Sequence, residues 1–446
     1  MAKKKKNSSD IKIRVGRRKV KAPWWVFLIL LIVAALAVGG YFIYYAMKPE
    51  KGASSSTATS SAPAASSTVE STSTPTVVGN VAPIDIYLQE LGNGHTGDSI
   101  YIKAGDNDIL IDAGSNNASA KTLTAFLKSK VTDNKLEYVI ATHAHTDHIG
   151  AFYGTDGIFG NFDCRTIIDF PKYMSDKDPT STTSVFGRYI HERDAEVSGG
   201  TSFGAEHYTA LECYNADSEG TTGAHRYYTL GENLKMQILY NYYYDHSQTA
   251  GENDYSVCLQ FIQGNNHYLF CGDCEELSED TVVANNSLTH CVFYKADHHG
   301  SKTSTGPKLM AAITPKYVGI SCVAGNYEYK QTHFDYTFPC QRTINTLGPI
   351  TKAIMVTSLG SPTSTTAVSS FNGTIHVAGY GPDEKDVTMT GSVNSTYLKD
   401  SAWFKETGNQ EGGAVDEGVS SVGGSSITTT HATTDPNRYW PEGGVD

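Results

Sequence analysis

The fold is decided by one stretch of the sequence, Thr142-His143-Ala144-His145-Thr146-Asp147-His148-Ile149-Gly150. Three histidines and one aspartate fall within six of its positions. A short buried strand is predicted directly before it, at residues 136–141, because that run is apolar and partly β-branched. Residues two apart at the end of a strand point the same way, so we expect His143 and His145 to reach one metal ion together.

Asp147 and His148 follow in a turn or in the first residues of a helix, where we expect them to face a second ion. Imidazole nitrogen combined with carboxylate oxygen is the ligand mixture that zinc and similar cations favour. A polar loop that merely contains histidine is the alternative, and it explains a single histidine better than it explains His-x-His-x-Asp-His. The motif therefore predicts a metal site.

The N-terminal part of the chain has the composition of a membrane anchor. Residues 1–21 form a basic segment with ten Lys or Arg and one Asp, and no charged residue occurs from Trp24 to Met47. A helix needs about 20 apolar residues to cross a bilayer, whereas the apolar region of a cleaved signal peptide has only about 7–15. We expect a single transmembrane helix at residues 22–47, with residues 1–21 in the cytoplasm and the rest of the chain extracellular.

Two more segments lack the pattern of a folded domain. Residues 48–80 are rich in Ser, Thr and Ala, which predicts a flexible linker. Residues 381–446 are expected to form a low-complexity C-terminal tail. The folded domain is therefore predicted at residues 81–380.

Within the domain, the order of predicted elements is strand, strand, strand, helix, strand. The strands are expected at residues 85–91, 98–102, 108–114 and 136–141, and the helix at 120–130. An α/β fold of four layers, the αββα sandwich, accommodates this order with the His-rich motif after the last strand.

His-x-His-x-Asp-His resembles the signature of the metallo-β-lactamase superfamily. Within that superfamily, the chain resembles the hydrolase domain of the ComEC family of DNA-uptake competence proteins, over about Ile84 to Val377. The resemblance rests on residues 253–257 (Asn-Asp-Tyr-Ser-Val), on Gly272-Asp273 and on residues 297–301 (Asp-His-His-Gly-Ser). It implies the metallo-β-lactamase fold and a hydrolytic activity.

The resemblance also implies roles for individual residues. Asp273 would bridge two ions, and Asp147 and Asp273 would hold the attacking hydroxide as the catalytic pair. The implied metal ligands are His143, His145, Asp147, His148, Asp273 and His299. Residues implied to support the ligands or to contact substrate are Asp112, His298, Ser301 and Lys302.

One position of the superfamily pattern has no clean match. The third-motif histidine should lie just beyond the strand predicted at residues 234–240. His246 is nearest, displaced by about two positions. If His246 is not a ligand, one of the two ions is held more weakly, or only one ion binds.

The expected cofactor is a divalent metal, two ions of zinc or manganese, and no nucleotide cofactor is expected. Two ions about 3.5–4 Å apart activate a shared water for hydrolysis of a phosphodiester, ester or amide. Competence-type domains are thought to cut DNA, and a related exported branch removes phosphorylcholine from surface polymers. The resemblance therefore favours a membrane-anchored extracellular phosphodiesterase that acts on DNA or on a cell-surface polymer.

The net charge of the chain and the unmatched third-motif histidine leave other functions open. Beyond residue 21 the net charge is −21, which disfavours general binding of nucleic acid, because neutralisation of phosphates by Lys and Arg drives it. The non-enzyme alternative is a non-catalytic envelope or DNA-uptake-associated binding protein on a metallo-β-lactamase fold. A true β-lactamase is a weaker alternative, because His-His-Gly-Ser resembles the competence-type subgroup.

Overall fold

The structure is a computed structural model of the 446-residue chain. It describes residues 11–15, 18–22, 79–200, 204–247, 250–325, 338–361, 364–401, 440–441 and 444–445. The chain divides into two compact units, Met1–Ser73 and Thr74–Asp446. In the first unit, β1 (Ile11–Val15) pairs antiparallel with β2 (Arg18–Ala22).

Among the described residues, no helix is both long and apolar enough to cross a membrane. The run from Trp24 to Met47 lies outside those residues, so the transmembrane helix at 22–47 stays a prediction. Residues 48–78 of the predicted linker and 402–439 of the predicted tail also lie outside them.

One sheet of the larger unit has eight strands, in the order β19-β18-β3-β4-β5-β6-β7-β8. Its antiparallel part consists of β3 (Ile84–Leu88), β4 (Ile100–Ala104), β5 (Asn107–Ile111), β18 (Ile375–Gly379) and β19 (Val387–Gly391). Parallel strands continue from β5 through β6 (Lys135–Ala141), β7 (Asp163–Asp169) and β8 (Glu206–Thr209).

The other sheet has nine strands, in the order β17-β16-β15-β14-β13-β12-β11-β10-β9. Its first half consists of β9 (Glu219–Gly220), β10 (Tyr227–Gly231), β11 (Leu234–Ile238), β12 (Leu259–Gln263) and β13 (Asn266–Phe270). Its second half consists of β14 (Phe293–Lys295), β15 (Tyr317–Ala324), β16 (Ile354–Ser361) and β17 (Ser364–Ser370). Strands β13 to β16 are parallel, and β10 to β13 are antiparallel.

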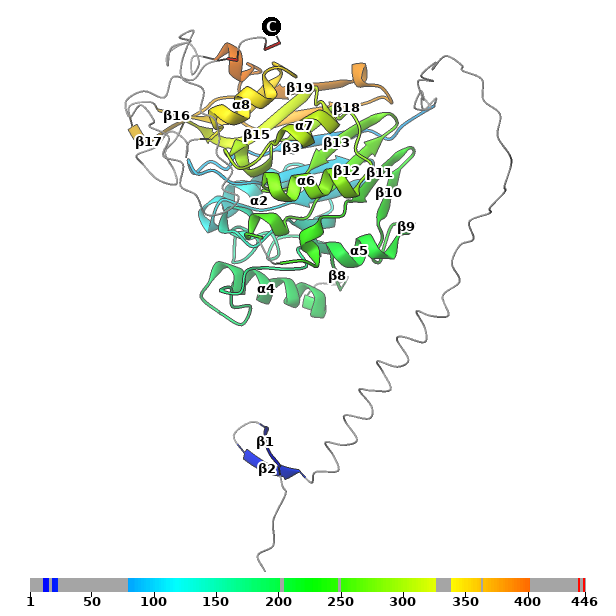
Figure 1. Cartoon of the computed structure of the whole chain (residues 1–446), viewed down its shortest axis with the longest axis vertical. Helices are drawn as coiled ribbons and strands as arrows, with labels where there is room; N and C mark the ends of the chain where they lie inside the picture. Colours follow the sequence, from blue (N-terminus) through cyan, green and yellow to red (C-terminus); the bar gives the residue numbers. More distant parts are fainter. Residues whose placement is uncertain are drawn as a thin grey trace, which may run out of the picture. The chain divides into compact units, whose positions relative to one another are not determined.

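The two sheets face each other, and helices cover the outer faces. Strand β13 shows the alternation that builds two cores: Tyr268 and Phe270 point into the core between the sheets, and Leu269 points into a second core. That second core is closed by α6 (Glu276–Asn285), α7 (Pro307–Ile313) and α8 (Gln341–Leu347), which lie over the sheet in Figure 1.

On the other side, the periodicity of α2 (Ala120–Lys128) explains its packing. Ala120, Leu123, Thr124 and Leu127 are buried at helical spacing. Helix α4 (Val185–Ala195) buries Phe186 and Tyr189, while α5 (Ala210–Ala216) follows β8. An α/β fold with two mixed sheets is thus confirmed, and it is consistent with the predicted αββα arrangement.

The folded part continues beyond residue 380, where the sequence pattern placed its end. Strand β19 pairs with β18 along its whole length, and residues up to Ser401 are described. Val387 and Met389 are buried, whereas Thr388 between them and Thr390 after them are exposed. Only two apolar residues carry this alternation, which is why the sequence pattern did not predict the strand.

The strands of both sheets place polar loops at their carboxyl ends. Asp112 follows β5, the His-rich motif follows β6, Asp273 follows β13 and His299 follows β14. All four strands lie in or next to the parallel part of a sheet, so these loops gather at one edge of the sandwich.

Candidate metal centre

The His-rich motif lies between β6 and a single helical turn, α3 (Thr146–Ile149). His143 and His148 are fully buried, and the side chain of Asp147 is 20% exposed. His145 stands at the N-cap of α3, and its carbonyl accepts hydrogen bonds from the backbone amides of His148 and Ile149. The turn therefore folds all four predicted ligands toward one place.

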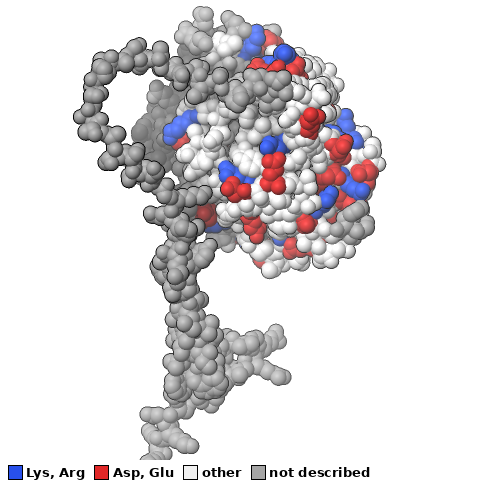
Figure 2. Space-filling model, turned by 90° about the vertical axis from the view of Figure 1, so that its right-hand side faces the viewer, with Lys and Arg blue, Asp and Glu red and all other residues white. Residues whose placement is uncertain are grey.

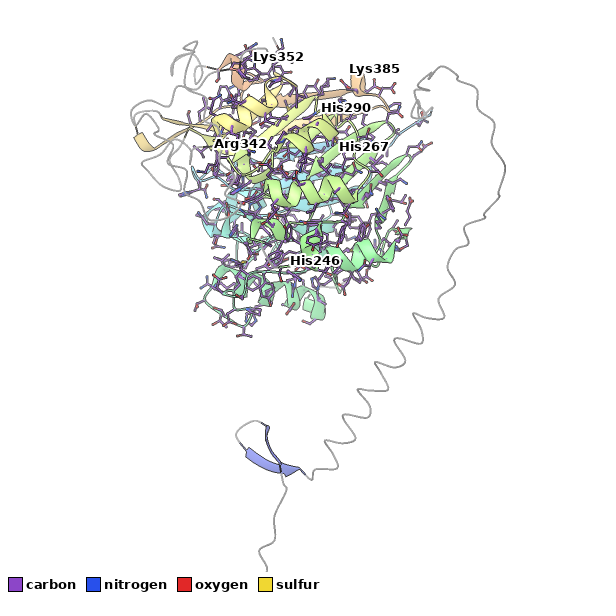
Figure 3. All side chains as sticks on the ribbon, in the orientation of Figure 1. His246, His267, His290, Arg342, Lys352 and Lys385 are labelled. Atoms are coloured by element: carbon purple, nitrogen blue, oxygen red, sulfur yellow. The ribbon has the colours of Figure 1, made fainter. Side chains whose placement is uncertain are left out.

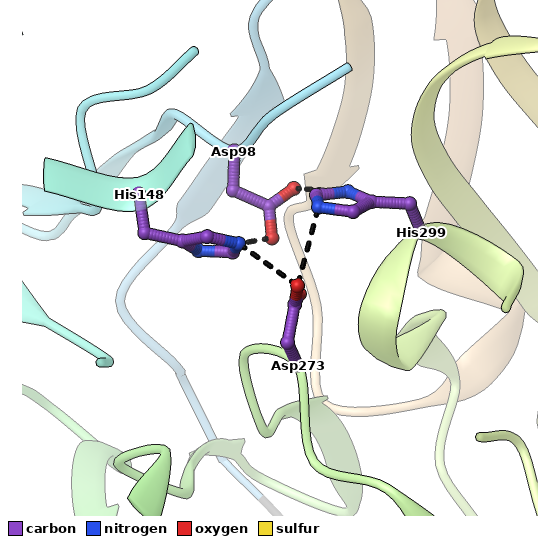
Figure 4. A group of neighbouring side chains, drawn as sticks. All are labelled: Asp98, His148, Asp273 and His299. Carbon is purple, nitrogen blue, oxygen red and sulfur yellow. Dashed lines mark ion pairs between the residues drawn. The ribbon is translucent and has the colours of Figure 1, made fainter. Parts of the chain in front are cut away.

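Two groups of ligand atoms result. In the first, His143 Nε2 and His145 Nδ1 lie 2.9 Å apart. In the second, Asp273 Oδ2 lies 3.1 Å from His148 Nε2 and 3.3 Å from His299 Nε2 (Figure 4). Asp147 Oδ2 joins this second group, 3.5 Å from His299 Nε2. We call them the first pair (His143 and His145) and the second group (Asp147, His148, Asp273 and His299).

The other ring nitrogen of each buried histidine is held by a neighbour. His148 Nδ1 lies 2.7 Å from Asp112 Oδ2, and His299 Nδ1 lies 2.9 Å from the carbonyl oxygen of Ser321. His143 Nδ1 lies 3.1 Å from Thr142 Oγ1 and 3.3 Å from Ser256 Oγ. Such partners fix ring orientation and tautomer, which leaves the Nε2 atoms to face a metal.

Asp112 was expected to support the histidines, and the structure places it in that position. It lies directly after β5 with a φ of 59°, and its carboxylate accepts hydrogen bonds from the amide and hydroxyl of Thr142, both at 2.7 Å. The strand predicted to reach residue 114 therefore ends at Ile111, where the backbone leaves the extended conformation.

Asp98 was not predicted as a site residue. Together with His148, Asp273 and His299, it places ligand atoms within 4.8 Å of one another. Its oxygens lie closest to the Nδ1 atoms, however, 3.8 Å from that of His148 and 3.7 Å from that of His299. Because those nitrogens are already hydrogen-bonded, we place Asp98 behind the ligands rather than among them.

Lys295, the last residue of β14, is fully buried next to this cluster. Its ammonium group pairs with Asp98, donates to the carbonyl of Gly272 at 3.0 Å and lies 3.6 Å from Asp273 Oδ1. Burial alone would lower the pKa of Lys295, but the carboxylates of Asp98 and Asp273 raise it above its ordinary value. The lysine is therefore charged at neutral pH.

The histidines of the two groups have opposite pKa shifts. Burial, together with the neighbouring His148 and His145, lowers the pKa of His143 well below its ordinary value. Burial also lowers those of His148 and His299, but nearby carboxylates outweigh it. Asp273 and Asp112 raise the pKa of His148 well above its ordinary value, and Asp273 and Asp98 raise that of His299 to about 9.

Two glycines are required by close packing around the motif. A Cβ on Gly114 would lie 1.5 Å from the carbonyl oxygen of Asp147, so the loop after β5 reaches the motif only with glycine. Gly272 has a φ of 57°, and a Cβ there would lie 2.7 Å from the Cβ of Thr142. These contacts bring Asp273 and the His-rich motif together.

The residues present fit a divalent metal. The Nε2 atoms of His148 and His299 are buried, and no well-aligned hydrogen bond from the described residues reaches them. Both face a carboxylate oxygen, and imidazole plus carboxylate is a donor set suited to zinc or manganese. Buried polar atoms without partners are costly in a folded protein, and a bound cation would satisfy these.

The remaining predicted residues lie around the cluster. His298 is partly exposed, and its Nδ1 lies 3.5 Å from Glu275 Oε1 and 3.4 Å from Asn253 Nδ2. Ser301 is buried and contacts Thr303 at 3.1 Å within the same loop. The carbonyl of Lys302 accepts a hydrogen bond from Arg342. The contacts described for Ser301 and Lys302 do not reach the ligand atoms.

His246, the nearest match to the third-motif histidine, lies away from the cluster. Figure 3 labels its side chain. Its ring stacks on Tyr242 with centroids 3.7 Å apart, its Nδ1 contacts Asp245 at 2.7 Å, and its side chain is 42% exposed. The contacts described for His246 are with Tyr242 and Asp245 and do not reach His143 or His145. The first pair therefore has no third histidine from this position.

A family model supports the fold and the site. Residues 92–161, which include the His-rich motif, match the model of the metallo-beta-lactamase superfamily. Over those residues the chain is similar to the metallo-beta-lactamase superfamily, and the α/β fold with two mixed sheets is consistent with that similarity. The resemblance to ComEC proteins stays a prediction. No curated protein matches the sequence.

Several solved structures are similar in outline. The metallo-beta-lactamase fold protein YhfI from Bacillus subtilis is 9% identical, with 64% of this chain and 99% of that chain covered and a TM-score of 0.34. A diphosphatase of the PhnP family is 13% identical, with 64% and 98% covered and a TM-score of 0.29. CmlA, a diiron β-hydroxylase from Streptomyces venezuelae, is 13% identical, with 56% and 45% covered and a TM-score of 0.29. With TM-scores below 0.5, we transfer no activity from them.

Proposed function

We propose that this protein is a metal-dependent phosphodiesterase, anchored in the cell membrane by residues 22–47, with its catalytic domain outside the cell. One observation carries the hydrolase proposal: Asp147, His148, Asp273 and His299 converge from both sheets, beside His143 and His145. We assign these six residues as the metal ligands. The metal would be zinc or manganese, and two such ions would supply an activated water and a clamp for the phosphate oxygens.

The residues of the chain have distinct parts in this proposal. Asp147 is the ligand of the second group that reaches solvent, so the substrate would approach from its side. Its pKa is lowered, because the nearby imidazoles of His299 and His148 outweigh the effect of burial, so Asp147 is a carboxylate at neutral pH. Together with Asp273, it can orient the attacking water. His298, which is partly exposed, would contact the substrate.

The charge of the chain favours some phosphodiester substrates over others. On the face drawn in Figure 2, Lys and Arg side chains are interspersed with Asp and Glu rather than gathered. The chain beyond residue 21 carries a net charge of −21. Because duplex DNA is held by many Lys and Arg contacts to phosphate, these features favour a cell-surface polymer or a short phosphodiester over long duplex DNA.

The unmatched third-motif position favours one other function. If the centre cannot retain metal, the protein would be a non-catalytic binding protein of the cell envelope or of DNA uptake. The exposed position of His246 is the observation behind this alternative.

The test is to measure metal content and turnover of bis(p-nitrophenyl) phosphate on the full chain in detergent. Asp147→Asn is compared with Asp245→Asn, a matched control whose carboxylate lies on the surface beside His246. Bound metal with turnover lost only in Asp147→Asn would support the phosphodiesterase. Bound metal without turnover would indicate an ester or amide substrate, and absence of both would indicate the binding protein.

A further inference from the structure

A buried lysine, Lys295, lies next to the metal ligands assigned above. The proposed function gives it no role. Lys295 Nζ pairs with the Asp98 carboxylate and lies 3.6 Å from Asp273 Oδ1. Its third contact is the carbonyl of Gly272, at 3.0 Å. All three side chains, Asp98, Asp273 and Lys295, are almost completely buried.

Asp273 is thereby shared between two cationic environments. Its Oδ2 faces the imidazoles of His148 and His299, and its Oδ1 faces the ammonium group of Lys295. Asp98 lies behind the same two imidazoles and pairs with the same ammonium group. The lysine therefore contacts the carboxylates from the side opposite to the ligand-facing atoms.

This arrangement has a physical consequence when no metal is bound. The two buried carboxylates, Asp98 and Asp273, need positive charge close by. Removal of one partner of a buried ion pair is strongly destabilising, because the other charge is left buried without compensation. Lys295 supplies a cation from within the fold. The same charge repels an incoming divalent cation, because the two lie in a buried site of low dielectric constant.

We propose that Lys295 is a positioning residue, an internal counter-cation that holds Asp98 and Asp273 in place before the metal binds and weakens the affinity for the metal. The proposal depends on the metal centre and does not require that the substrate be a phosphodiester. It predicts effects of opposite sign on two quantities when Lys295 loses its charge: the stability of the metal-free protein falls, and the affinity for the metal rises. A purely structural role would not produce both.

The experiment uses the full chain in detergent, stripped with a chelator and then reloaded with zinc or manganese. Lys295→Met keeps most of the length of the side chain and removes the charge. In the stripped protein we expect the Tm to fall by roughly 10 °C. In the reloaded protein we expect less than half of that fall, because the metal supplies the missing positive charge. Metal affinity should rise by about tenfold.

Lys103→Met is the matched control, since Lys103 forms an ion pair with Asp108 at 2.9 Å but is 38% exposed. Its effect on Tm should be small and equal in both states. If Lys295→Met lowers the Tm equally in both states, or lowers metal affinity, the proposal is wrong.

A second variant covers the case in which Lys295→Met does not fold. The double variant Asp98→Asn, Lys295→Met removes both charges of the closest pair, so it should recover a large part of the lost stability. A double variant no more stable than Lys295→Met would overturn the proposal. Neither result depends on turnover, so failure of the phosphodiesterase proposal and failure of this one are distinguishable.

Discussion

The two groups of ligands in the candidate metal centre are built in different ways. The first pair, His143 and His145, comes from one turn, and the fixed nitrogen of His143 contacts the neutral hydroxyls of Thr142 and Ser256. The second group takes residues from both sheets, and charged neighbours surround it. Local sequence places the first pair, whereas the second group depends on the whole fold and on its charges.

This difference predicts unequal metal binding. The second group offers four ligand atoms, and the first pair offers two imidazoles without the histidine expected from the third motif. We therefore expect the second group to hold its ion more tightly than the first pair. The predictions below test or refine that ranking, starting with the largest effect.

The largest effect is expected from Asp273→Asn. Asp273 Oδ2 is the atom on which both imidazoles of the second group converge, so its loss should lower metal affinity by more than 100-fold and abolish turnover. His145→Ala, in the first pair, should reduce the amount of bound metal by at most one ion. Elemental analysis after dialysis measures both. If the two variants lose metal equally, the two groups are not ranked as we infer.

A smaller effect is expected from Asp112→Asn. The Asp112 carboxylate holds His148 Nδ1 at 2.7 Å, and loss of such a support lowers metal affinity by about 10–100-fold. Ser256→Ala is the counterpart for the first pair, because Ser256 Oγ lies 3.3 Å from His143 Nδ1. We expect less than a tenfold change there, since a second hydroxyl, that of Thr142, remains. Titration with a chromophoric metal chelator measures both values, and a larger loss in Ser256→Ala would reverse the ranking.

The sequence predicted the locally determined part of the site well. Strand β6 and the turn that follows it are encoded by consecutive residues, and the structure brings His143, His145, Asp147 and His148 to one place. Gly272-Asp273 and His299 were located by resemblance to a family, and they join the same place from the other sheet. Their mutual distances could not be predicted from the sequence, because they depend on how two sheets pack.

Asp98 and Lys295 were missed for the same reason. Nothing local to Asp98 in the sequence indicates an ion pair across the sandwich. Lys295 stands at the end of an apolar run, residues 291–296, and a charged residue in such a strand was the available signal. Burial of a lysine requires a charged partner, and only the fold shows which carboxylate that is.

The pH dependence of metal binding should also separate the two groups. The pKa of His299 is raised to about 9, and that of His148 is also raised, so both carry a proton at pH 7. A metal must displace these protons, so affinity at the second group should rise roughly tenfold per pH unit for each proton displaced between pH 6 and 8. The pKa of His143 is lowered, so binding at the first pair should change much less.

The raised pKa values of His148 and His299 also determine how the stability of the metal-stripped protein changes with pH. A histidine whose folded pKa is raised stabilises the fold fully below its unfolded pKa of about 6.5, and this contribution is lost as the pH rises through the folded value. The stripped protein should therefore unfold at a lower temperature at pH 9.5 than at pH 6. Calorimetry at both pH values measures this, and a stripped protein that is more stable at pH 9.5 would contradict the assignment.

The smallest effect is expected from Glu252→Gln, which acts on the backbone beside the first pair. Glu252 is buried, and its two carboxylate oxygens accept the amide of Ala144 at 3.1 Å and the amide of Met174 at 2.9 Å. Glutamine keeps one acceptor and turns the other atom into a donor that faces an N–H group, at a cost of about 1–3 kcal/mol. We expect a Tm lower by a few degrees and a change of only a few-fold in metal affinity, confined to the ion that binds less tightly. Isothermal titration at pH 8 resolves the two ions. A change confined to the tighter ion would show that the first pair, and not the second group, is the stronger site.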